Sequence, residues 1–386
     1  MIYKRKLVVR SQRNWIARSG VINIDNKSFS NFIAEENTFS LFSFHFSNYL
    51  LKFLKFIFRH PILSIVICEI YSISKRIKGR VLILECGSAP FFSFIQPTII
   101  YLEDPLGLFG WQPKEINKFN IAILSLRMKF SRFRGFIFMS KTSRLAAINI
   151  FGSQIINRYD LGIVYPTGLP KDNDNYNTLH SKQNDIVFGF CSIDPIGKGA
   201  LELIEAMKKI NKTAHLVVVV PKKFHNIFDP LKKHDIQLTI KTWGEIDICS
   251  DFFDKVDYVL SPTFMDSCPL LLVEAISRGV PFVAADVFAI KELSELCTNS
   301  IVIKRSLKFN YYDENGIATK NIPPLKFMAN CSKYNEQKEY DNMFIEQFIT
   351  VLNNLEKPEK VMSNDEIKMR LQLDNLKSIV NIALKK

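Results

Sequence analysis

Two carboxylates, Asp266 and Glu274, lie in the segment 261–286 with seven residues between them. The segment predicts a loop after an apolar strand, a short helix over about 270–277, and a second buried strand. Gly279 suits the end of that helix, because glycine adopts the left-handed conformation that often terminates helices. Both acids are therefore expected where they can accept hydrogen bonds from the hydroxyl groups of a ligand.

A second loop, residues 190–199, follows a predicted strand and ends in Lys198 and Gly199. In a doubly wound sheet, ligands bind outside the carboxyl ends of the strands, which is where both loops belong. The start of a helix there offers backbone N–H groups to a phosphate, and Lys198 adds a full positive charge. Together with Asp266 and Glu274, Lys198 and this helix start predict a site for a ligand with phosphates and hydroxyls, such as a nucleotide sugar. The alternative is an ordinary surface lysine, a loop acid and a solvated helix residue.

The elements that must position these loops predict an α/β fold. From residue 186 onward, strands alternate with helices, as in the βαβ units of a parallel, doubly wound sheet. Since the chain has 386 residues, 47% of them apolar, two domains of ordinary size are expected. The domains are predicted at 1–164 and 165–358, followed by a C-terminal helix at 359–386 that returns to the first domain. The polar stretch 165–185 is the predicted linker.

The first domain is also expected to contain a parallel sheet. Short apolar runs rich in β-branched residues predict buried strands at 64–70, 80–86, 98–104 and 133–140. In the tail of the chain, a helix is expected near 335–353.

Positive charge is concentrated in the first 80 residues, which hold fourteen Lys and Arg against four Asp and Glu, while the whole chain has a net charge of +13. Such a segment indicates an anionic partner, either nucleic acid or a membrane surface. A predicted helix at 47–60 carries Lys52, Lys55 and Arg59 in one stripe among apolar residues, which favours a helix lying in an anionic membrane interface. A core helix with a solvated basic edge is the alternative. Nucleic acid is not expected, since no zinc-finger, RNP-like or helix-turn-helix pattern is found.

The seven cysteines are an odd number, and no two are closer than 18 residues. This spacing fits neither a disulfide framework nor a zinc site, and a reducing cytosol is the simplest interpretation. The N-terminal residues contain no apolar run long enough for a signal peptide. The expected location is therefore the cytoplasm, peripheral on the inner face of the membrane.

The stretch DSCPLLLVEAISRGVP, 266–281, resembles the donor-binding segment of retaining glycosyltransferases of the GT-B fold, family four (group 1). The family pattern there is an acid, seven residues and a glutamate. The stretch IVFGFCSIDPIGKGALELIEAM, 186–207, resembles the family's strand, basic loop and helix, and the resemblance extends over roughly 136–296. It implies two Rossmann-like domains facing a central cleft, the first binding the acceptor at a membrane and the second binding the nucleotide sugar.

The resemblance also implies a role for each matched residue. Glu274 would bind the ribose hydroxyls of the donor, Asp266 would hold hydroxyls of the transferred sugar, and Lys198 would neutralise the leaving diphosphate. Glu103 and Asp104, at the end of a first-domain strand, are assigned to the acceptor side. The remaining donor-binding positions are Ser192, Gly199, Trp243, Gly244, Ser267, Cys268, Leu270 and Leu271, with Trp243 and Gly244 where the base-contacting loop begins. Neither a metal ion nor a cofactor is expected, because the family uses cations of the protein.

The sequence departs from the family pattern in three places. Cys191 and Ser192 stand where a glycine and an arginine are usual, Phe288 and Ala289 replace a glycine pair, and no histidine accompanies the strand end at 103–104. The leading interpretation is a metal-independent, retaining transfer of sugar from a nucleotide donor to a lipid-linked glycan acceptor in surface polysaccharide or lipopolysaccharide synthesis. The departures leave open a GT-B protein that binds nucleotide sugars with weak or no transfer. A sugar-nucleotide epimerase of the same fold is a third interpretation.

Overall fold

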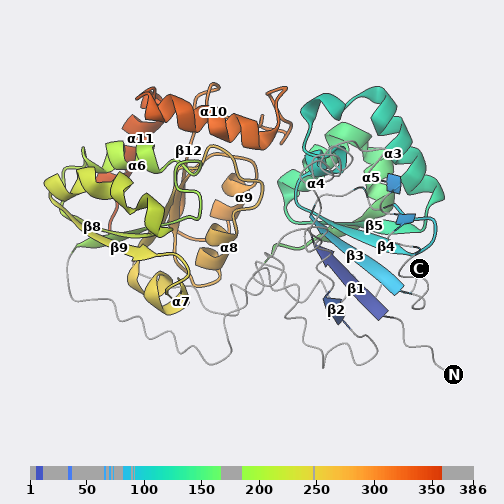
Figure 1. Ribbon diagram of the computed structural model, residues 1–386, viewed down its shortest axis with the longest axis horizontal. Coiled ribbons are helices and arrows are strands. Elements are labelled where there is room, and N and C mark those ends of the chain that lie inside the picture. The colour runs from blue at the N-terminus through green and yellow to red at the C-terminus, as the bar shows by residue number, and fades with distance from the viewer. Residues whose placement is uncertain are drawn as a thin grey trace. The chain divides into compact units, whose positions relative to one another are not determined.

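The computed structural model describes residues 92–166, 185–246 and 248–358, with shorter pieces at 6–11, 34–36, 65–66, 69–70, 73, 81–87 and 90. These residues form two compact units, each with its own parallel sheet (Figure 1). The first unit takes in the described residues up to 166 and the stretch Asp313–Pro323, and the second takes in the rest.

Several predictions fall on residues outside this description. The C-terminal helix at 359–386 and the membrane helix with Lys52, Lys55 and Arg59 lie entirely outside it, and so does most of the linker. The predicted domain boundaries at 164 and 358 therefore stay predictions.

Six parallel strands form the sheet of the second unit, in the order β12-β11-β10-β7-β8-β9. Counted from the first strand of the unit, this order is that of the dinucleotide-binding fold, in which the connections change direction between two adjacent strands. Here those two strands are β7 and β10, which pair directly. The strands are β7 (Ile186–Cys191), β8 (Ala214–Val220), β9 (Ile236–Thr242), β10 (Tyr258–Ser261), β11 (Phe282–Ala285) and β12 (Ile301–Ile303).

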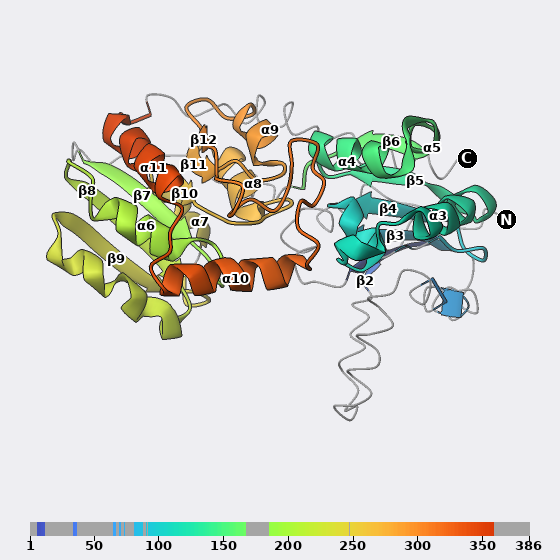
Figure 2. The same cartoon turned by 90° about the horizontal axis from the view of Figure 1, so that it is seen from above.

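Helices cover both faces of this sheet. They are α6 (Ala200–Met207), the 3-10 helix η4 (Lys222–Lys233), α7 (Ile248–Asp251), the 3-10 helix η5 (Phe253–Lys255), α8 (Leu270–Ile276), α9 (Ile290–Ser294), α10 (Pro324–Glu336) and α11 (Asn342–Asn354). The last helix returns to lie along α6 (Figures 1 and 2). The single helix expected near 335–353 is instead two, because the chain turns at Lys338, which has a positive φ of 63°, and Asp341 then caps α11.

The first unit contains a second parallel sheet, in the order β2-β1-β3-β4-β5-β6. Its elements are β1 (Lys6–Ser11), β2 (Ala34–Glu36), β3 (Val81–Gly87), β4 (Thr98–Leu102), the 3-10 helices η2 (Pro105–Phe109) and η3 (Pro113–Glu115), α3 (Lys118–Phe130), β5 (Phe133–Phe138), α4 (Lys141–Phe151), α5 (Ser153–Tyr159) and β6 (Asp160–Ile163). Aromatic rings fill its core, since Phe92 packs edge-to-face on Phe133 at 4.8 Å and both are buried. Many phenylalanines of this unit are therefore part of its hydrophobic core.

The run at 64–70 is not the strand that its composition predicts. Its described residues, 65–66 and 69–70, are helical. Ile65 is buried and Val66 and Ile70 are exposed, so the segment does not lie inside the sheet. The prediction was wrong because composition and length do not separate a buried strand from a short stretch of helix when the run is this brief.

Candidate active site

The predicted cation and the first predicted acid meet at the carboxyl edge of the second sheet. Lys198 follows β7, and Asp266 follows β10, the strand beside it. The Lys198 Nζ donates to Asp266 Oδ2 at 2.6 Å and to the Met265 carbonyl oxygen at 3.0 Å. Both side chains keep part of their surface exposed, 30% and 20%. The pair therefore stands at the point where ligands bind in sheets of this order, within reach of a molecule from solvent.

The loop that carries Lys198 is folded onto its own side chains. Ser192 Oγ accepts a hydrogen bond from the N–H of Asp194 at 3.0 Å. The Asp194 carboxylate in turn accepts one from the N–H of Gly197 at 3.3 Å, and the Asp194 carbonyl accepts one from the N–H of Lys198 at 3.1 Å. The hydroxyl of Ser192 thus shapes the loop that carries Lys198, and its predicted role in donor binding stays a prediction.

Gly199 joins this loop to the next. Its φ of +79° is a conformation that glycine adopts easily and other residues rarely do. A Cβ atom on residue 199 would lie 2.0 Å from the carbonyl oxygen of Pro262. Only glycine allows the start of α6 to approach the loop after β10 this closely.

The loop after β10 turns sharply before it presents Asp266. Thr263 and Met265 are buried, and Thr263 Oγ1 donates to the Met265 carbonyl oxygen at 2.9 Å. The same carbonyl accepts from Lys198, so this hydroxyl and the lysine share one acceptor. The turn fixes the backbone on which Asp266 stands.

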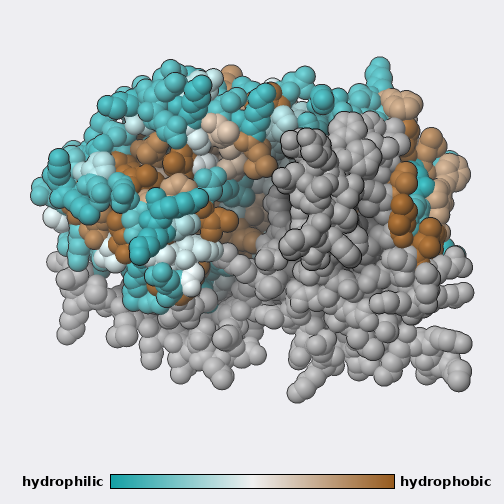
Figure 3. Space-filling model, in the orientation of Figure 1, coloured by the Kyte–Doolittle hydropathy of each residue, from teal (hydrophilic) through white to brown (hydrophobic). Residues whose placement is uncertain are grey.

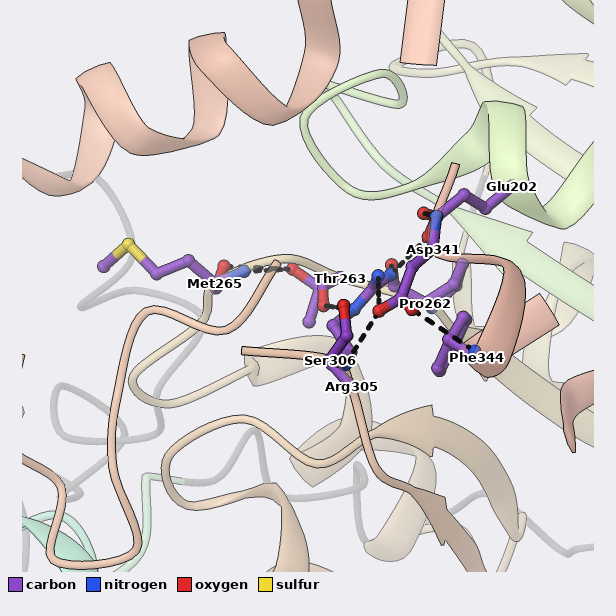
Figure 4. A network of polar contacts seen from close by, with 8 residues as sticks. All are labelled: Glu202, Pro262, Thr263, Met265, Arg305, Ser306, Asp341 and Phe344. Atoms are coloured by element: carbon purple, nitrogen blue, oxygen red, sulfur yellow. Dashed lines mark hydrogen bonds and ion pairs between the residues drawn. The ribbon is translucent and has the colours of Figure 1, made fainter. Parts of the chain in front are cut away.

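A buried arginine, Arg305, is hydrogen-bonded to the backbone of this loop (Figure 4). Arg305 follows β12, and its Nη2 and Nε donate to the carbonyl oxygens of Pro262 at 2.5 Å and Thr263 at 3.0 Å. Its guanidinium also lies 4.4 Å from the ring centroid of Phe264 and 4.1 Å from that of Phe344. With the side chain fully buried, such a charge is stable only when it is paired and hydrogen-bonded.

Two acids from distant elements neutralise Arg305. Glu202, in the first turn of α6, accepts from Arg305 Nη2 at 2.6 Å, and Asp341 Oδ2 lies 3.6 Å from its Nη1. Glu202 also accepts from the N–H of Asp341 at 3.0 Å. Asp341 caps α11 by accepting from the N–H of Phe344 at 3.4 Å. The loop after β10 is thereby tied to α6, β12 and α11 at once.

The second predicted acid lies on the helix after this loop. Glu274 belongs to α8 and is half-buried, and its carbonyl accepts from Ser277 Oγ at 2.8 Å. The first turn of α8 presents N–H groups that have no acceptor inside the helix. Around it, Ser267 and Cys268 are buried while Leu270 and Leu271 are half-buried. These residues lie next to Asp266 in the chain, at the same edge of the sheet.

Other predicted site residues lie further away. Trp243 and Gly244 follow β9, which is the outermost strand and is separated from β7 by β8. In the first unit, Asp104 is buried and its carboxylate caps η2 by accepting from the N–H of Leu106 at 2.8 Å. Glu103 precedes it directly after β4. The structure therefore gives Asp104 a structural contact in addition to the role that the sequence predicts.

Sequence reasoning missed several residues that support the site. No local pattern points to Arg305, Glu202 or Asp341. The one signal in the sequence was that Glu202 is an acid within the apolar run of α6. Asp286, directly after β11, was also missed. Burial raises the pKa of its carboxyl, while Lys291 and Lys304 act in the opposite direction.

The part of the chain that the structure describes contains no group of three or more His, Cys, Asp or Glu residues placed to hold a metal ion.

The family model of group 1 glycosyl transferases matches residues 185–309. This range contains both loops and the Lys198–Asp266 pair. The second unit is a group 1 glycosyltransferase domain. For this part of the chain, the match confirms the predicted family and enzyme class.

Solved structures place the glycosyltransferase among known folds. An apo lipopolysaccharide outer core galactosyltransferase, WaaB, matches 90% of this chain and 99% of its own, with a TM-score of 0.52 and 10% sequence identity. Alr3699/HepE of Anabaena in complex with UDP-glucose matches 99% of this chain and 100% of its own, with a TM-score of 0.52 and 14% identity. These likenesses confirm the predicted GT-B fold with two Rossmann-like units. No curated protein sequence shows significant similarity to the glycosyltransferase.

Proposed function

We propose that this glycosyltransferase takes its sugar from a nucleotide donor bound at the carboxyl edge of the second sheet. The observation that carries the proposal is the Lys198–Asp266 pair at the point where the strand order reverses. Nucleotides bind in this crevice in sheets of the same order. A likeness in fold to HepE, whose structure holds UDP-glucose, supports the same class of donor.

Each part of the site would then have a defined task. Negative charge builds up on the diphosphate as its bond to the sugar breaks, and Lys198 with the first turn of α8 would stabilise that charge. Asp266 would hold Lys198 in place before the donor binds and would contact the hydroxyls of the sugar. Glu274 would bind the ribose, and the loop that begins at Trp243 would contact the base.

The reaction is proposed to retain the configuration of the sugar and to need no metal ion or bound cofactor. Cations of the protein would supply the charge that a metal would otherwise supply, and Lys198, which is partly exposed beside Asp266, would be the first of them. The resemblance of residues 266–281 to the donor segment of retaining enzymes supports the stereochemistry.

For the acceptor, we propose a lipid-linked glycan in surface polysaccharide or lipopolysaccharide synthesis, met at the inner face of the membrane. The basic first 80 residues and the fold likeness to a lipopolysaccharide galactosyltransferase support this class. Glu103 and Asp104 are the proposed acceptor-side positions, and anionic lipid the proposed membrane partner. Within the described residues, no helix has the length and apolar character needed to cross a bilayer.

The donor proposal is tested by nucleotide-sugar binding and turnover. A panel containing UDP-glucose is screened for thermal stabilisation, since a ligand at 100 times its dissociation constant stabilises a protein by about 2.7 kcal/mol. Hydrolysis and transfer are then compared between the wild type, Lys198→Ala, and Lys209→Ala, an exposed lysine beyond the end of α6. Loss confined to Lys198→Ala supports the site, whereas equal rates in all three proteins contradict it.

A second candidate is a protein that binds nucleotide sugars but transfers them weakly or not at all. Ser192 favours it, since the arginine usual in the resembled pattern is absent there and the hydroxyl of Ser192 is used within the loop. Donor binding without measurable hydrolysis or transfer, over a full acceptor panel, would select this candidate.

A further inference from the structure

Helix α10 and two strand-end loops of the second unit enclose a cavity of about 350 Å³. Asp194 and Ile196 come from the loop after β7, Phe224 comes from the first turn of η4, and the rest of the lining belongs to α10. The volume lies at the lower end of the range for ligand pockets. All of these elements belong to one compact unit, and none of the residues assigned to the donor lines the cavity within the described part of the chain.

The loop that carries Lys198 separates this cavity from the proposed donor site. The Lys198 side chain is hydrogen-bonded to the loop after β10. Asp194 and Ile196, from the same loop, line the cavity instead. A Cβ atom on Gly197 would lie 3.0 Å from Met328 Cε, so the backbone of the loop is packed against α10. The cavity is therefore a separate site that shares one wall with the donor site.

Part of the lining is apolar. Ile196, Phe224 and Met328 are half-buried, while Leu325 and Ala329 are exposed to solvent. Figure 3 shows hydrophilic residues along the upper edge of the second unit, where α10 lies in Figure 1, with hydrophobic residues just below them. In ligand pockets, such apolar side chains bury the carbon skeleton of the ligand, and a few polar groups fix its orientation.

The polar part of the lining carries charges of both signs. Asp194 and Glu336 are acids, and Lys333 is a base. A second lysine, Lys223, has its Nζ 4.7 Å from the ring centroid of Phe224. Among the residues that the structure describes, neither the Lys333 nor the Glu336 side chain has a hydrogen-bond or ion-pair partner. Both are therefore available to a ligand.

This mixture of charges restricts the chemistry of the ligand. An anion would meet two acids, and a cation would meet two lysines. A zwitterion could pair with both signs, but its charges cost more to remove from water than neutral hydroxyls do. Carboxylates only accept hydrogen bonds and ammonium groups only donate them, whereas a hydroxyl does both. A neutral ring with several hydroxyls is thus the ligand that suits the whole lining.

From this arrangement we propose that the cavity binds a neutral sugar ring, at a site separate from the donor site. The C–H groups of the ring pack on Phe224 and Met328, and its hydroxyls donate to Glu336 and accept from Lys333. The inference goes beyond the proposed donor site, and it rests on the proposed function only in that the glycan acceptor is one source of such a ring. A free sugar is the other source.

The test measures sugar binding to the full-length protein while the donor site is occupied. The protein is saturated with UDP and titrated, by saturation-transfer difference NMR, with the methyl glycosides of glucose, galactose and mannose and with maltose and lactose. Glucosamine and glucuronic acid are the charged counterparts, and phenylalanine is the zwitterion. Titrations are repeated at low and high NaCl, and the affinity for UDP is measured separately on every protein by calorimetry.

Two variants change the cavity without touching the residues of the donor site. Ala329→Trp fills the cavity from an exposed position on α10 and is expected to remove detectable sugar binding. Lys333→Ala/Glu336→Ala removes two charged hydrogen-bonding groups and should lower the affinity for the sugar by roughly tenfold or more. All three side chains are exposed, so the fold and the affinity for UDP should be retained.

Matched controls make the same kinds of change outside the cavity. Asn330→Trp adds the same side chain to the next residue of α10, which is exposed and does not line the cavity. Lys326→Ala/Glu346→Ala removes one exposed lysine and one exposed glutamate from α10 and α11. Both controls should bind sugars as the wild type does.

The proposal holds if neutral sugars bind the wild type independently of NaCl and if both cavity variants, but neither control, lose affinity. Tighter binding of the disaccharides assigns the site to a glycan, binding of the monosaccharides alone assigns it to a free sugar, and either result upholds the site. The proposal is overturned if no neutral sugar binds, if the cavity variants bind as the wild type does, or if only a charged or zwitterionic probe binds. Because UDP affinity is measured separately, failure of the donor site is distinguished from failure of this one.

Discussion

Gly199 and the carbonyl oxygen of Pro262 are packed so closely that a Cβ atom on residue 199 would come within 2.0 Å of that oxygen. The same oxygen accepts a hydrogen bond from Arg305 on its other side. One backbone carbonyl thus fixes the distance between the loop with Lys198 and the loop with Asp266. The predictions below follow from this junction and from the groups around it.

Gly199→Ala should push the two loops apart. The substitution introduces overpacking of about 1–3 kcal/mol, and the positive φ of residue 199 adds about 1–2 kcal/mol. We expect a lower midpoint of urea unfolding and at least a tenfold loss of transfer. Gly152→Ala provides a control, since Gly152 also has a positive φ but its Cβ would meet nothing within 4 Å. Equal activity in Gly199→Ala and the wild type would contradict the junction.

Lys198 and Asp266 should act in opposite directions on binding of a nucleoside diphosphate. Lys198→Ala removes the cation that meets the diphosphate, so binding weakens. Asp266→Asn removes the charge that neutralises Lys198 in the free enzyme, so binding of UDP or another diphosphate tightens by about five- to tenfold, on the order of 1 kcal/mol. Transfer should fall in both variants, because Asp266 is also proposed to contact the sugar. Isothermal titration calorimetry distinguishes the two effects, and weaker binding in Asp266→Asn would argue against the pair as the diphosphate site.

Arg305 should affect catalysis as well as stability, because its buried side chain holds the loop that carries Asp266. Arg305→Met leaves Glu202 and Asp341 as buried acids without their cation, at a cost of about 3–5 kcal/mol. Leu352→Ala in the core of α11 serves as the matched control, since it costs about 2–5 kcal/mol without touching the loop. At a temperature where both variants are folded, kcat should fall in Arg305→Met and not in Leu352→Ala. Arg305→Lys keeps the charge and should restore part of kcat; equal kcat values in Arg305→Met and the control would limit Arg305 to stability.

Asp286 should make the stability of the protein depend on pH. Since burial raises the pKa of this carboxyl, the folded state binds its proton more tightly than the unfolded state does. The resulting stability is present below the ordinary pKa, near pH 4, and is lost as the pH rises through the raised value. Asp286→Asn should therefore raise the melting temperature at neutral pH, with a gain that shrinks towards pH 4. A variant that is less stable than the wild type at neutral pH would show that the carboxylate is favourable where it lies.

The group 1 family pattern usually has an arginine where this chain has Ser192. Restoring that arginine tests whether residue 192 faces the diphosphate. Ser192→Arg would place a guanidinium beside Lys198 and should tighten binding of the nucleoside diphosphate. It also removes the hydroxyl that accepts from the N–H of Asp194, so Ser192→Ala is measured beside it. Binding by Ser192→Arg that is no tighter than by Ser192→Ala would mean that residue 192 does not face the diphosphate.

The sequence predicts best what is local. Lys198 and Asp266 could be recognised because each follows an apolar strand within one βα unit, and a parallel sheet brings such strand ends together. Arg305 could not be recognised, since its partner Glu202 lies 103 residues away in the chain and its partner Asp341 caps a later helix, α11. No spacing rule connects these three residues. Packing in three dimensions alone reveals that set.

The exposed apolar side chains of α3, which are Phe119, Leu126 and Phe130, escaped prediction for a different reason. Phe119 and Leu126 face outward while Leu124 and Met128 face the core, so the helix is apolar on two sides and its sequence has no clear amphipathic period. The same ambiguity explains the helical residues found at 65–70, where the composition predicts a strand. In both places, exposure in the folded structure supplies information that hydropathy does not contain.

The triad of Glu202, Arg305 and Asp341 has a consequence for how the enzyme is made. During synthesis, Glu202 leaves the ribosome first, and Asp341 emerges 139 residues later. Until then the loop after β10 is present with all of its motif residues but lacks one of the two acids that balance its arginine. A chain cut short before α11 should therefore contain all six strands and every residue of the proposed donor motif, yet leave α6 and β12 without the helix that packs on them. Such a chain should fail to assemble the donor site and be a target for chaperones and proteases.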